Sequence, residues 1–273
     1  MGRPLGVVMS EKDTVGMTFW DHLTELFDRL RKGLLAFIIA TIAVMIVPIS
    51  LDPANVDLSN PFYQTIASFV IQNFQDRFLP QGITLIPVNF FAPLEVYFFV
   101  SLVMGAIIGL PVVSYELYTF LQPALRKHEK RFALQFIASF TTLFVFGLVL
   151  GYLYVVPLTF RTMILFSEFQ NLTPIYNFSE FFSMVGTILL ICGLIFTFPT
   201  YIYLLVRAGI LKTEQLTKNR KYLYGIILII IALVDPDPTL VTEGVTFIPI
   251  VLLMELTILI SKRIEQKRES PTS

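Results

Sequence analysis

Long apolar runs alternate with short charged segments along the whole chain. Six of these runs are predicted to cross a membrane as helices, and they cover residues 33–49, 92–121, 132–156, 180–206, 222–234 and 245–260. The apolar residues come in blocks with few charges, which is typical of bilayer-spanning helices rather than of one-sided soluble helices. We therefore predict an all-α integral membrane protein with six transmembrane helices, in which residues 1–273 form a single membrane domain.

Proline and polar residues separate the predicted spans. Residues 50–90 are polar and rich in proline, so we expect a long first outer loop in which residues 61–78 form a surface helix. One side of that helix would carry Phe62, Ile66, Phe69 and Val70. Pro157 is predicted to end the third span. Asn177 and Glu180 are predicted to cap the fourth helix.

The last two predicted spans are short. The run 222–234 has 13 residues and the run 245–260 has 16. At about 1.5 Å per residue they reach roughly 20 and 24 Å, against a hydrocarbon core of about 30 Å. They form either a re-entrant hairpin or two short crossings that thin the bilayer locally. We favour two crossings, because the charge distribution places the C-terminal tail on the cytoplasmic side.

An amphipathic helix is predicted to lead into the first span. Thr18 with Asp21 three residues later is typical of a helix N-terminus. Apolar side chains then recur every three or four residues, at Trp20, Leu23, Phe27, Leu30 and Leu34. The charged side chains occupy another face, so we expect this N-terminal helix to lie at the membrane interface.

Lysine and arginine are distributed very unevenly across the predicted spans. With a cytoplasmic N-terminus and six crossings, 18 of the 20 basic residues are cytoplasmic, and only Arg77 and Arg161 lie outside. Cytoplasmic loops of membrane proteins carry such an excess. The bias predicts a multi-pass protein of the plasma (inner) membrane with both termini cytoplasmic. It also places the charged segment 122–131 in the first cytoplasmic loop.

The composition agrees with a membrane protein and excludes several functions. The chain is 55% hydrophobic with a mean hydropathy of +0.73, which is high for a protein with a water-exposed surface. Its formal net charge of zero gives no reason to expect a nucleic-acid partner. The single cysteine, Cys192, allows no intrachain disulfide and is expected to be a packing residue. The sequence lacks enzyme, phosphate-binding and metal-binding motifs, so we expect no enzyme, no cofactor and no metal.

Two glutamates beside histidines mark the predicted cytoplasmic face. His22 and Glu25 share one face of the amphipathic helix, and His128 and Glu129 lie in the charged loop. Each glutamate also has an ordinary interpretation. Glu25 would pair with Arg29 one turn later, and Glu129 with the cations beside it. Each histidine would simply form hydrogen bonds at the interface.

Four more glutamates lie in or beside the predicted spans. Ionisable groups inside a membrane are costly and usually functional. Glu95 and Glu116 lie near span ends, where they would reach the interface. Glu243 follows a proline-rich break that admits water, and Glu255 is the most enclosed by sequence. These residues leave two alternatives open: a proton-coupled small-solute transporter with Glu95, Glu243 and Glu255 as a relay, and a purely structural scaffold.

Four segments resemble the TatC family, the multispanning receptor subunit of the twin-arginine protein translocase. They are residues 22–26 with 29–30, 91–95, 120–129, and 248–249 with Glu255. The most specific is Phe-Leu-Gln-Pro-Ala-Leu-Arg-Lys-His-Glu at 120–129, which resembles the first cytoplasmic loop of the family. The resemblance follows the family's order along nearly the whole chain.

The resemblance implies a receptor and scaffold for the export of folded proteins. Such proteins bind twin-arginine signal peptides at the cytoplasmic face. They recruit small single-span subunits of the TatA and TatB type, use the proton-motive force, and are expected to form homo-oligomers within the complex. The implied signal-peptide site comprises His22, Glu25, Phe120, Leu125, Lys127, His128 and Glu129. A planar guanidinium suits a carboxylate, which it contacts through two hydrogen bonds.

The chain departs from the family pattern within the membrane. Thr197 stands where the family often has an acid before the proline of the fourth span, and Glu243 stands where a glutamine is expected. We hypothesise that Glu243 takes over the polar role and docks a partner helix. Glu255, Thr197 and Glu95 are the other intramembrane polar candidates.

Overall fold

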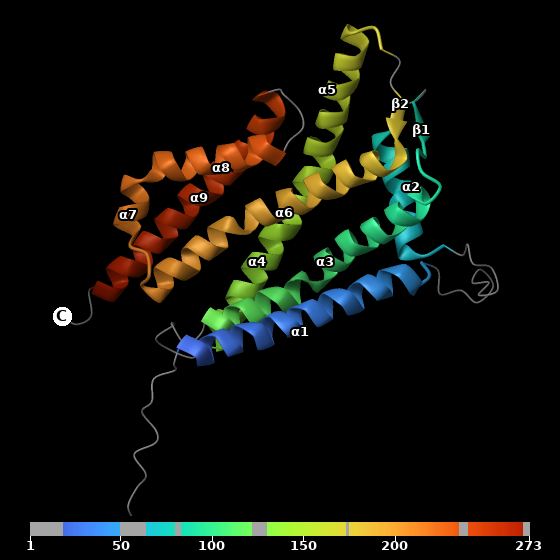
Figure 1. Ribbon diagram of the computed structural model, residues 1–273. Coiled ribbons are helices and arrows are strands. Elements are labelled where there is room, and N and C mark those ends of the chain that lie inside the picture. Colours follow the sequence, from blue (N-terminus) through green and yellow to red (C-terminus); the bar gives the residue numbers. More distant parts are fainter. Residues whose placement is uncertain are drawn as a thin grey trace, which may run out of the picture.

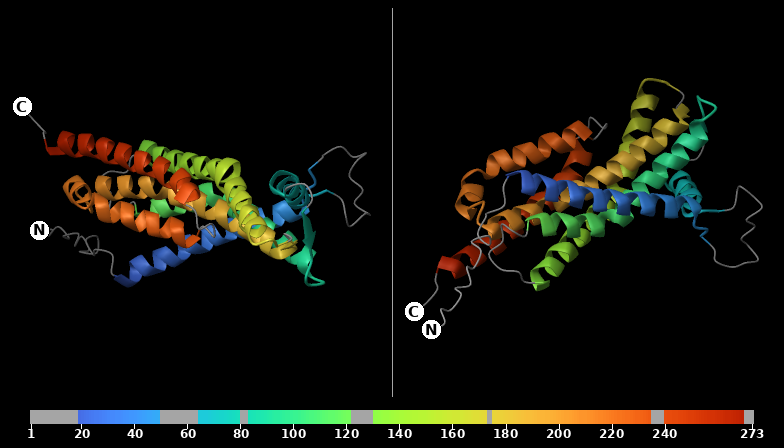
Figure 2. Two further views of the ribbon diagram at one scale, coloured as in Figure 1. Left: turned by 90° about the horizontal axis from the view of Figure 1, so that it is seen from above. Right: turned by 60° about the horizontal axis from the view of Figure 1, so that its bottom comes forward.

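Helices make up most of the chain that the computed structural model describes, which comprises residues 19–49, 64–79, 83–121, 130–172, 175–234 and 240–269 (Figure 1). The helices are α1 (Phe19–Ile46), α2 (Ile66–Phe78), α3 (Ala92–Leu121), α4 (Lys130–Leu150), α5 (Val156–Phe169), α6 (Phe178–Ala208), α7 (Thr213–Lys218), α8 (Arg220–Val234) and α9 (Leu240–Glu269). The strands are β1 (Thr84–Ile86) and β2 (Ile175–Asn177). The start of α1 and the end of α9 lie at the same end of the molecule, and α2 with both strands lies at the other (Figures 1 and 2).

Among the residues that the structure describes, four helical segments are long and apolar enough to cross a bilayer. They are Ala92–Phe120, Leu134–Phe169, Phe178–Arg207 and Leu240–Arg263. Within the described residues α1 and α8 are not among these four, because α1 begins with a charged half and α8 has only 15 residues. The structure therefore supports a mostly helical membrane protein with one short two-stranded sheet, while the number of six crossings stays a prediction.

The third long helix continues past Pro157, so the prediction that it ends there is wrong. A π-helix, Gly151–Val155, joins α4 directly to α5, and the helical run reaches Phe169. The Val156 N–H donates to the Gly151 carbonyl, five residues back. In a regular α-helix a proline lacks the N–H for the backbone hydrogen bond, and its ring clashes with the carbonyl four residues back. The wider π-helical turn just before Pro157 changes this hydrogen bonding and lets the helix continue.

The last helix is longer than predicted. α9 has 30 residues, and its apolar part, Leu240–Arg263, has 24. The prediction of a short final helix is therefore wrong, whereas α8 is short as predicted. The helix begins before Glu243 and Gly244. Its backbone hydrogen bonds form within the helix itself, so one charged residue and one glycine are tolerated in its first turns.

The predicted outer loop contains a helix and a strand. Thr65 caps α2, its Oγ1 accepting from the Ser68 N–H at 3.2 Å. The helix buries Ala67, Phe74 and Phe78, whereas Phe69 of the predicted apolar side is 47% exposed. Phe62, also predicted on that side, lies outside the described residues. β1 pairs with β2 in parallel, with Thr84 opposite Ile175, so the segment before α3 is joined to the segment before α6.

Glycines let the long helices approach closely at two crossings. A Cβ on Gly105 of α3 would lie 2.8 Å from the Cα of Thr41 in α1. A Cβ on Gly147 of α4 would lie 2.6 Å from the Cys192 carbonyl oxygen in α6. Gly109 and Gly151 follow these glycines at the four-residue spacing that is typical of close transmembrane crossings. This spacing is visible in the sequence, and our sequence interpretation did not use it.

Aromatic side chains fill the core beside these crossings. Phe136, Phe140 and Phe144 recur every four residues on α4, are buried, and pack against Leu204 of α6. Four-residue spacing places them on one helix face. Cys192 is buried among apolar side chains, which confirms its prediction as a packing residue.

Candidate functional site

An arginine links two glutamates where α1 begins and α3 ends. The Arg29 Nε and Nη2 atoms donate to Glu25 Oε1 at 3.0 and 2.5 Å. The Arg29 Nη1 atom donates to Glu116 Oε2 at 3.4 Å. The three side chains, which we call the charged triad, are 13–19% exposed. The predicted pairing of Glu25 with Arg29 is therefore confirmed, and Glu116 is a second partner.

The charged triad is a site for a guanidinium group. Hydrogen bonds between charged groups are stronger than neutral ones, and partial burial strengthens them further. Two carboxylates and one guanidinium leave the triad with a net charge of −1. The triad therefore holds one internal guanidinium between two carboxylates.

An apolar groove of about 320 Å³ extends from the charged triad along α1 and α3. Its wall is formed by Leu26, Arg29, Leu30, Gly33, Leu34 and Phe37 of α1 and by Ala106, Gly109, Leu110, Val113, Glu116 and Phe120 of α3. Only Arg29 and Glu116 of these residues are charged. The groove thus combines a charged end with an apolar wall, which suits a chain that has a cationic segment followed by an apolar one.

The structure describes part of the predicted signal-peptide site. It places Glu25 in the charged triad and Phe120 in the groove wall. His22 belongs to α1, but its side chain is not described. The other four predicted residues, Leu125, Lys127, His128 and Glu129, lie outside the described residues. The proximity of Glu129 to Glu25 therefore stays a prediction.

The sequence interpretation missed the role of Glu116. It treated this residue only as one that reaches the interface. The partner of Glu116 is 87 positions away, and only the packing of α1 against α3 brings the two together. A signal was nevertheless present, because a glutamate inside an apolar span needs a partner.

The intramembrane polar residues have separate environments. Ser179 donates to Glu95 at 3.2 Å, where α3 and α6 begin. Arg220 and Tyr224 of α8 donate to Glu255 Oε1 at 3.0 and 2.6 Å. Within the described part of the chain Glu243 has no polar partner, and no two of these three glutamates contact each other. The described residues therefore give no support to a continuous proton relay.

Thr197 has its hydrogen bond within its own helix. Its side chain is buried, and Oγ1 donates to the Leu194 carbonyl at 2.6 Å. A threonine bonded in this way needs no partner from another helix. The structure thus gives Thr197 a local role at the position where the family often has an acid.

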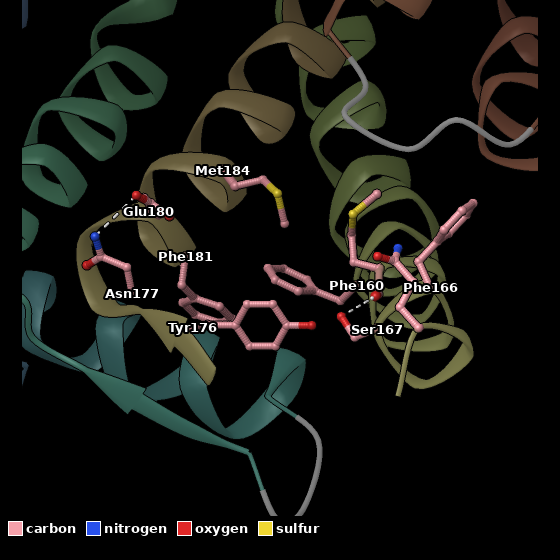
Figure 3. A pocket seen from close by; sticks show the side chains of 10 residues that line it. Phe160, Phe166, Ser167, Tyr176, Asn177, Glu180, Phe181 and Met184 are labelled. Carbon is pink, nitrogen blue, oxygen red and sulfur yellow. Dashed lines mark hydrogen bonds between the residues drawn. The ribbon is translucent and has the colours of Figure 1, made fainter. Parts of the chain in front are cut away.

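A second cavity, of about 530 Å³, lies between α5 and the start of α6 (Figure 3), at the end of the molecule away from the start of α1 and the end of α3 (Figure 1). The rings of Phe160 and Phe181 stand in its wall, and the hydroxyl of Tyr176 points into it. Asn177 caps α6 by accepting from the Ser179 N–H at 3.1 Å and donates to Glu180 at 3.3 Å, which confirms the predicted cap. Of the predicted signal-peptide residues that the structure describes, neither Glu25 nor Phe120 lines this cavity.

Comparison with known proteins identifies the family. Residues 21–249 match the sequence model of TatC, described as Sec-independent protein translocase protein. The chain belongs to the TatC family. It is 30% identical over 259 residues to the TatC protein of Escherichia coli (strain K12), covering 93% of this chain and 91% of that protein. It is 29% identical over 256 residues to that of Aquifex aeolicus (strain VF5), covering 93% and 98%.

Solved structures of TatC share the fold. The crystal structure of "Twin Arginine Translocase Receptor- TatC" matches with a TM-score of 0.70 and 28% identity, over 88% of this chain and 98% of that one. A structure of the same receptor in DDM matches with a TM-score of 0.71. The resemblance seen in the sequence is confirmed. TatC is a family of protein translocase components rather than of enzymes, and the charged triad lies within the matched residues.

Proposed function

We propose that this chain is the receptor and scaffold of a twin-arginine translocase and binds signal peptides where α1 begins and α3 ends. Membership in the TatC family supports the proposal, and the related crystal structures are of a twin arginine translocase receptor. The observation that carries it is the charged triad, in which Glu25 and Glu116 hold the guanidinium of Arg29. The chain thereby contains the same chemical contact that an arginine of a signal peptide requires.

We infer an exchange of guanidinium groups at Glu25. An arginine of the signal peptide replaces Arg29 on Glu25, and Arg29 stays bound to Glu116. Glu129 would bind the second arginine. It would form the other side of the site together with His22, Leu125, Lys127 and His128. This exchange leaves no charge unpaired in a half-buried place, which would be costly.

The groove is the proposed site for the apolar part of the signal peptide. Secretory signal peptides have a cationic segment followed by about 7–15 apolar residues. The groove wall on α1 extends from Leu26 to Phe37, which is roughly 16 Å at 1.5 Å per residue. A helical apolar segment of about 11 residues has the same length. Phe120 lies in the wall and would contact the peptide beside its arginines.

The proposal includes six crossings of the plasma (inner) membrane with both termini cytoplasmic. The four apolar spans support it, as does the position of the start of α1 and the end of α9 at one end of the molecule. Exposed apolar side chains near the start of α1 support an interfacial entry, since Leu30 is 62% and Leu34 53% exposed. The partners would be small single-span subunits of the TatA and TatB type and further copies of this chain, with transport driven by the proton-motive force.

Capture of signal peptides by the purified protein tests the proposed function. A peptide with two arginines, carrying a photocrosslinker, is compared with the same peptide carrying two lysines. We expect strong capture of the twin-arginine peptide only, because lysine does not form the two parallel hydrogen bonds of a guanidinium. Equal capture of the two peptides would overturn the proposal. Solute-dependent proton uptake into vesicles would favour the small-solute transporter instead.

Substitution of Glu116 tests the exchange. In a Glu116→Gln variant Arg29 loses its second charged partner and competes more strongly for Glu25. We expect peptide affinity to fall on the order of fivefold, or about 1 kcal/mol, as measured by titration with a fluorescent twin-arginine peptide. Glu95→Gln removes the other glutamate of α3, at the far end, and should leave the affinity unchanged. A similar loss in both variants, or in neither, would contradict the exchange.

Glu243 is the proposed docking residue for a partner helix. It lies in the first turn of α9, is half-buried, and has no polar partner among the described residues. We expect Glu243→Ala to reduce site-specific crosslinking of a small single-span subunit to α9. Glu214→Ala, at an exposed acid of α7, is the control and should not change crosslinking. Unchanged crosslinking in Glu243→Ala would assign this glutamate a purely structural role.

A further inference from the structure

The two basic residues that the sequence places on the outer side line the same pocket. Arg77 lies in the last turn of α2 and Arg161 in α5, 84 positions later. Both belong to the wall of a pocket of about 350 Å³ between these helices. The other 18 lysines and arginines are predicted to be cytoplasmic, so all of the predicted outer positive charge is gathered at this pocket.

Neither arginine has its charge neutralised by a contact within the described residues. Within the described part of the chain neither one forms a salt bridge. The guanidinium of Arg77 lies 5.8 Å from the centroid of the Tyr152 ring, a cation–π distance that holds the side chain without neutralising it. Glu168, the acid in the pocket wall, lies two turns after Arg161 and forms no salt bridge with either arginine. The pocket therefore carries a net charge of +1.

The remainder of the pocket wall is apolar. Phe78 and Phe160 are buried, while Leu165 is 55% exposed. Phe160 also lines the cavity shown in Figure 3, so the two spaces share this residue in their walls. The pocket thus offers two guanidinium groups and, beside them, an apolar surface that opens outward at Leu165.

Arg161 lies at the depth of lipid headgroups in the proposed topology. The helical run that contains it begins at Lys130, 31 residues earlier. At about 1.5 Å per residue this is roughly 46 Å, and a bilayer with its headgroups is about 40–45 Å thick. A modest tilt therefore brings Arg161 into the outer headgroup layer.

We propose that this pocket binds the phosphate headgroup of an anionic phospholipid of the outer leaflet. Arg77 and Arg161 bind the phosphate from two sides, because the planar guanidinium matches two phosphate oxygens at once. An acyl chain of the lipid lies against Leu165 and the apolar wall. A free phosphate ion would make the charged contacts but would leave the apolar wall uncovered.

Photolabelling of the full chain tests this site. The protein is placed in phosphatidylcholine nanodiscs that contain a small fraction of phosphatidylglycerol with a diazirine on one acyl chain. Mass spectrometry after chymotryptic digestion then measures labelling of residues 157–168. We expect this labelling to fall about fivefold in Arg161→Gln and more than tenfold in Arg77→Gln with Arg161→Gln, since each cation strengthens binding of an anionic lipid. Arg77→Lys with Arg161→Lys should retain part of it.

Controls separate the site from general attraction to the bilayer. Lys218→Gln with Lys221→Gln removes the same charge from exposed positions on α7 and α8 and should leave labelling of residues 157–168 unchanged. Circular dichroism should show the same helix content in all variants. Equal labelling in wild type and the double arginine variant, or equal labelling by a phosphatidylcholine probe, would overturn the proposal. Loss of labelling on addition of millimolar inorganic phosphate would show a free-anion site and overturn the lipid assignment.

Discussion

Replacing Glu25 with glutamine is expected to lower the affinity for a twin-arginine signal peptide at least tenfold. Glutamine keeps the size of the side chain and removes its charge. A hydrogen bond to a charged group contributes about 1.5–3 kcal/mol, which corresponds to roughly 10- to 150-fold in affinity. In the variant Arg29 keeps its contact with Glu116, so the fold of this region should be retained. Titration of the purified variant with a fluorescent peptide measures the loss.

Asp28→Asn is the matched control for this prediction. Asp28 lies on the same helix, is exposed, and carries the same charge as Glu25. We expect it to bind peptide as wild type does. Combining Glu25→Gln with Glu129→Gln should abolish the preference for arginine over lysine, because neither carboxylate remains. Equal losses in Asp28→Asn and Glu25→Gln would mean that the overall negative charge of α1, and not a specific contact, attracts the peptide.

Replacing Gly147 with leucine is expected to prevent α4 and α6 from packing. The Cβ alone would lie 2.6 Å from the Cys192 carbonyl oxygen and 2.8 Å from Phe196 Cβ, and both atoms are fixed in α6. Overpacking of a core commonly costs about 1–3 kcal/mol and more when backbone must move, so we expect at least about 3 kcal/mol here. Size-exclusion chromatography and thermal unfolding in detergent should show aggregated or strongly destabilised protein.

Gly225→Leu adds the same side chain at a helical glycine with open surroundings. Nothing lies within 4 Å of a Cβ at Gly225 in α8. Leucine also forms helices better than glycine, by about 0.5–1 kcal/mol. This variant should unfold at the same temperature as wild type or slightly higher. Destabilisation of both variants to the same degree would contradict the role of close helix approach at Gly147.

The sequence predicted those features that depend on local chemistry. The cap at Asn177, the pairing of Glu25 with Arg29 and the burial of Cys192 follow from spacing or from residue type, and the structure confirms them. Apolar blocks indicated helices, and the family resemblance is confirmed by the comparisons.

The sequence predictions were wrong where a neighbouring turn or a packed helix determines the helix bounds or the side-chain contact. Pro157 is a helix breaker in isolation, but the π-helix before it lets the helical run continue. The last span was predicted over residues 245–260, after Glu243, yet the backbone at Glu243 is already helical. The contact between Arg29 and Glu116 depends on the register of α1 against α3, which apolar periodicity does not reveal. The GxxxG spacing at Gly105 and Gly147 was the unused clue to how the helices pack.

The parallel pairing of β1 with β2 sets an order for assembly during synthesis. Thr84 of β1 can pair only after its partner Ile175 of β2 has been synthesised, 91 residues later. At about 5–20 residues per second the delay is roughly 5–18 s. During this time α3, α4 and α5 are made while β1 still lacks its partner strand. The end of the molecule that carries α2 and the two strands therefore closes late, after most of the helices exist, and a factor that shields unpaired strand edges would act in that interval.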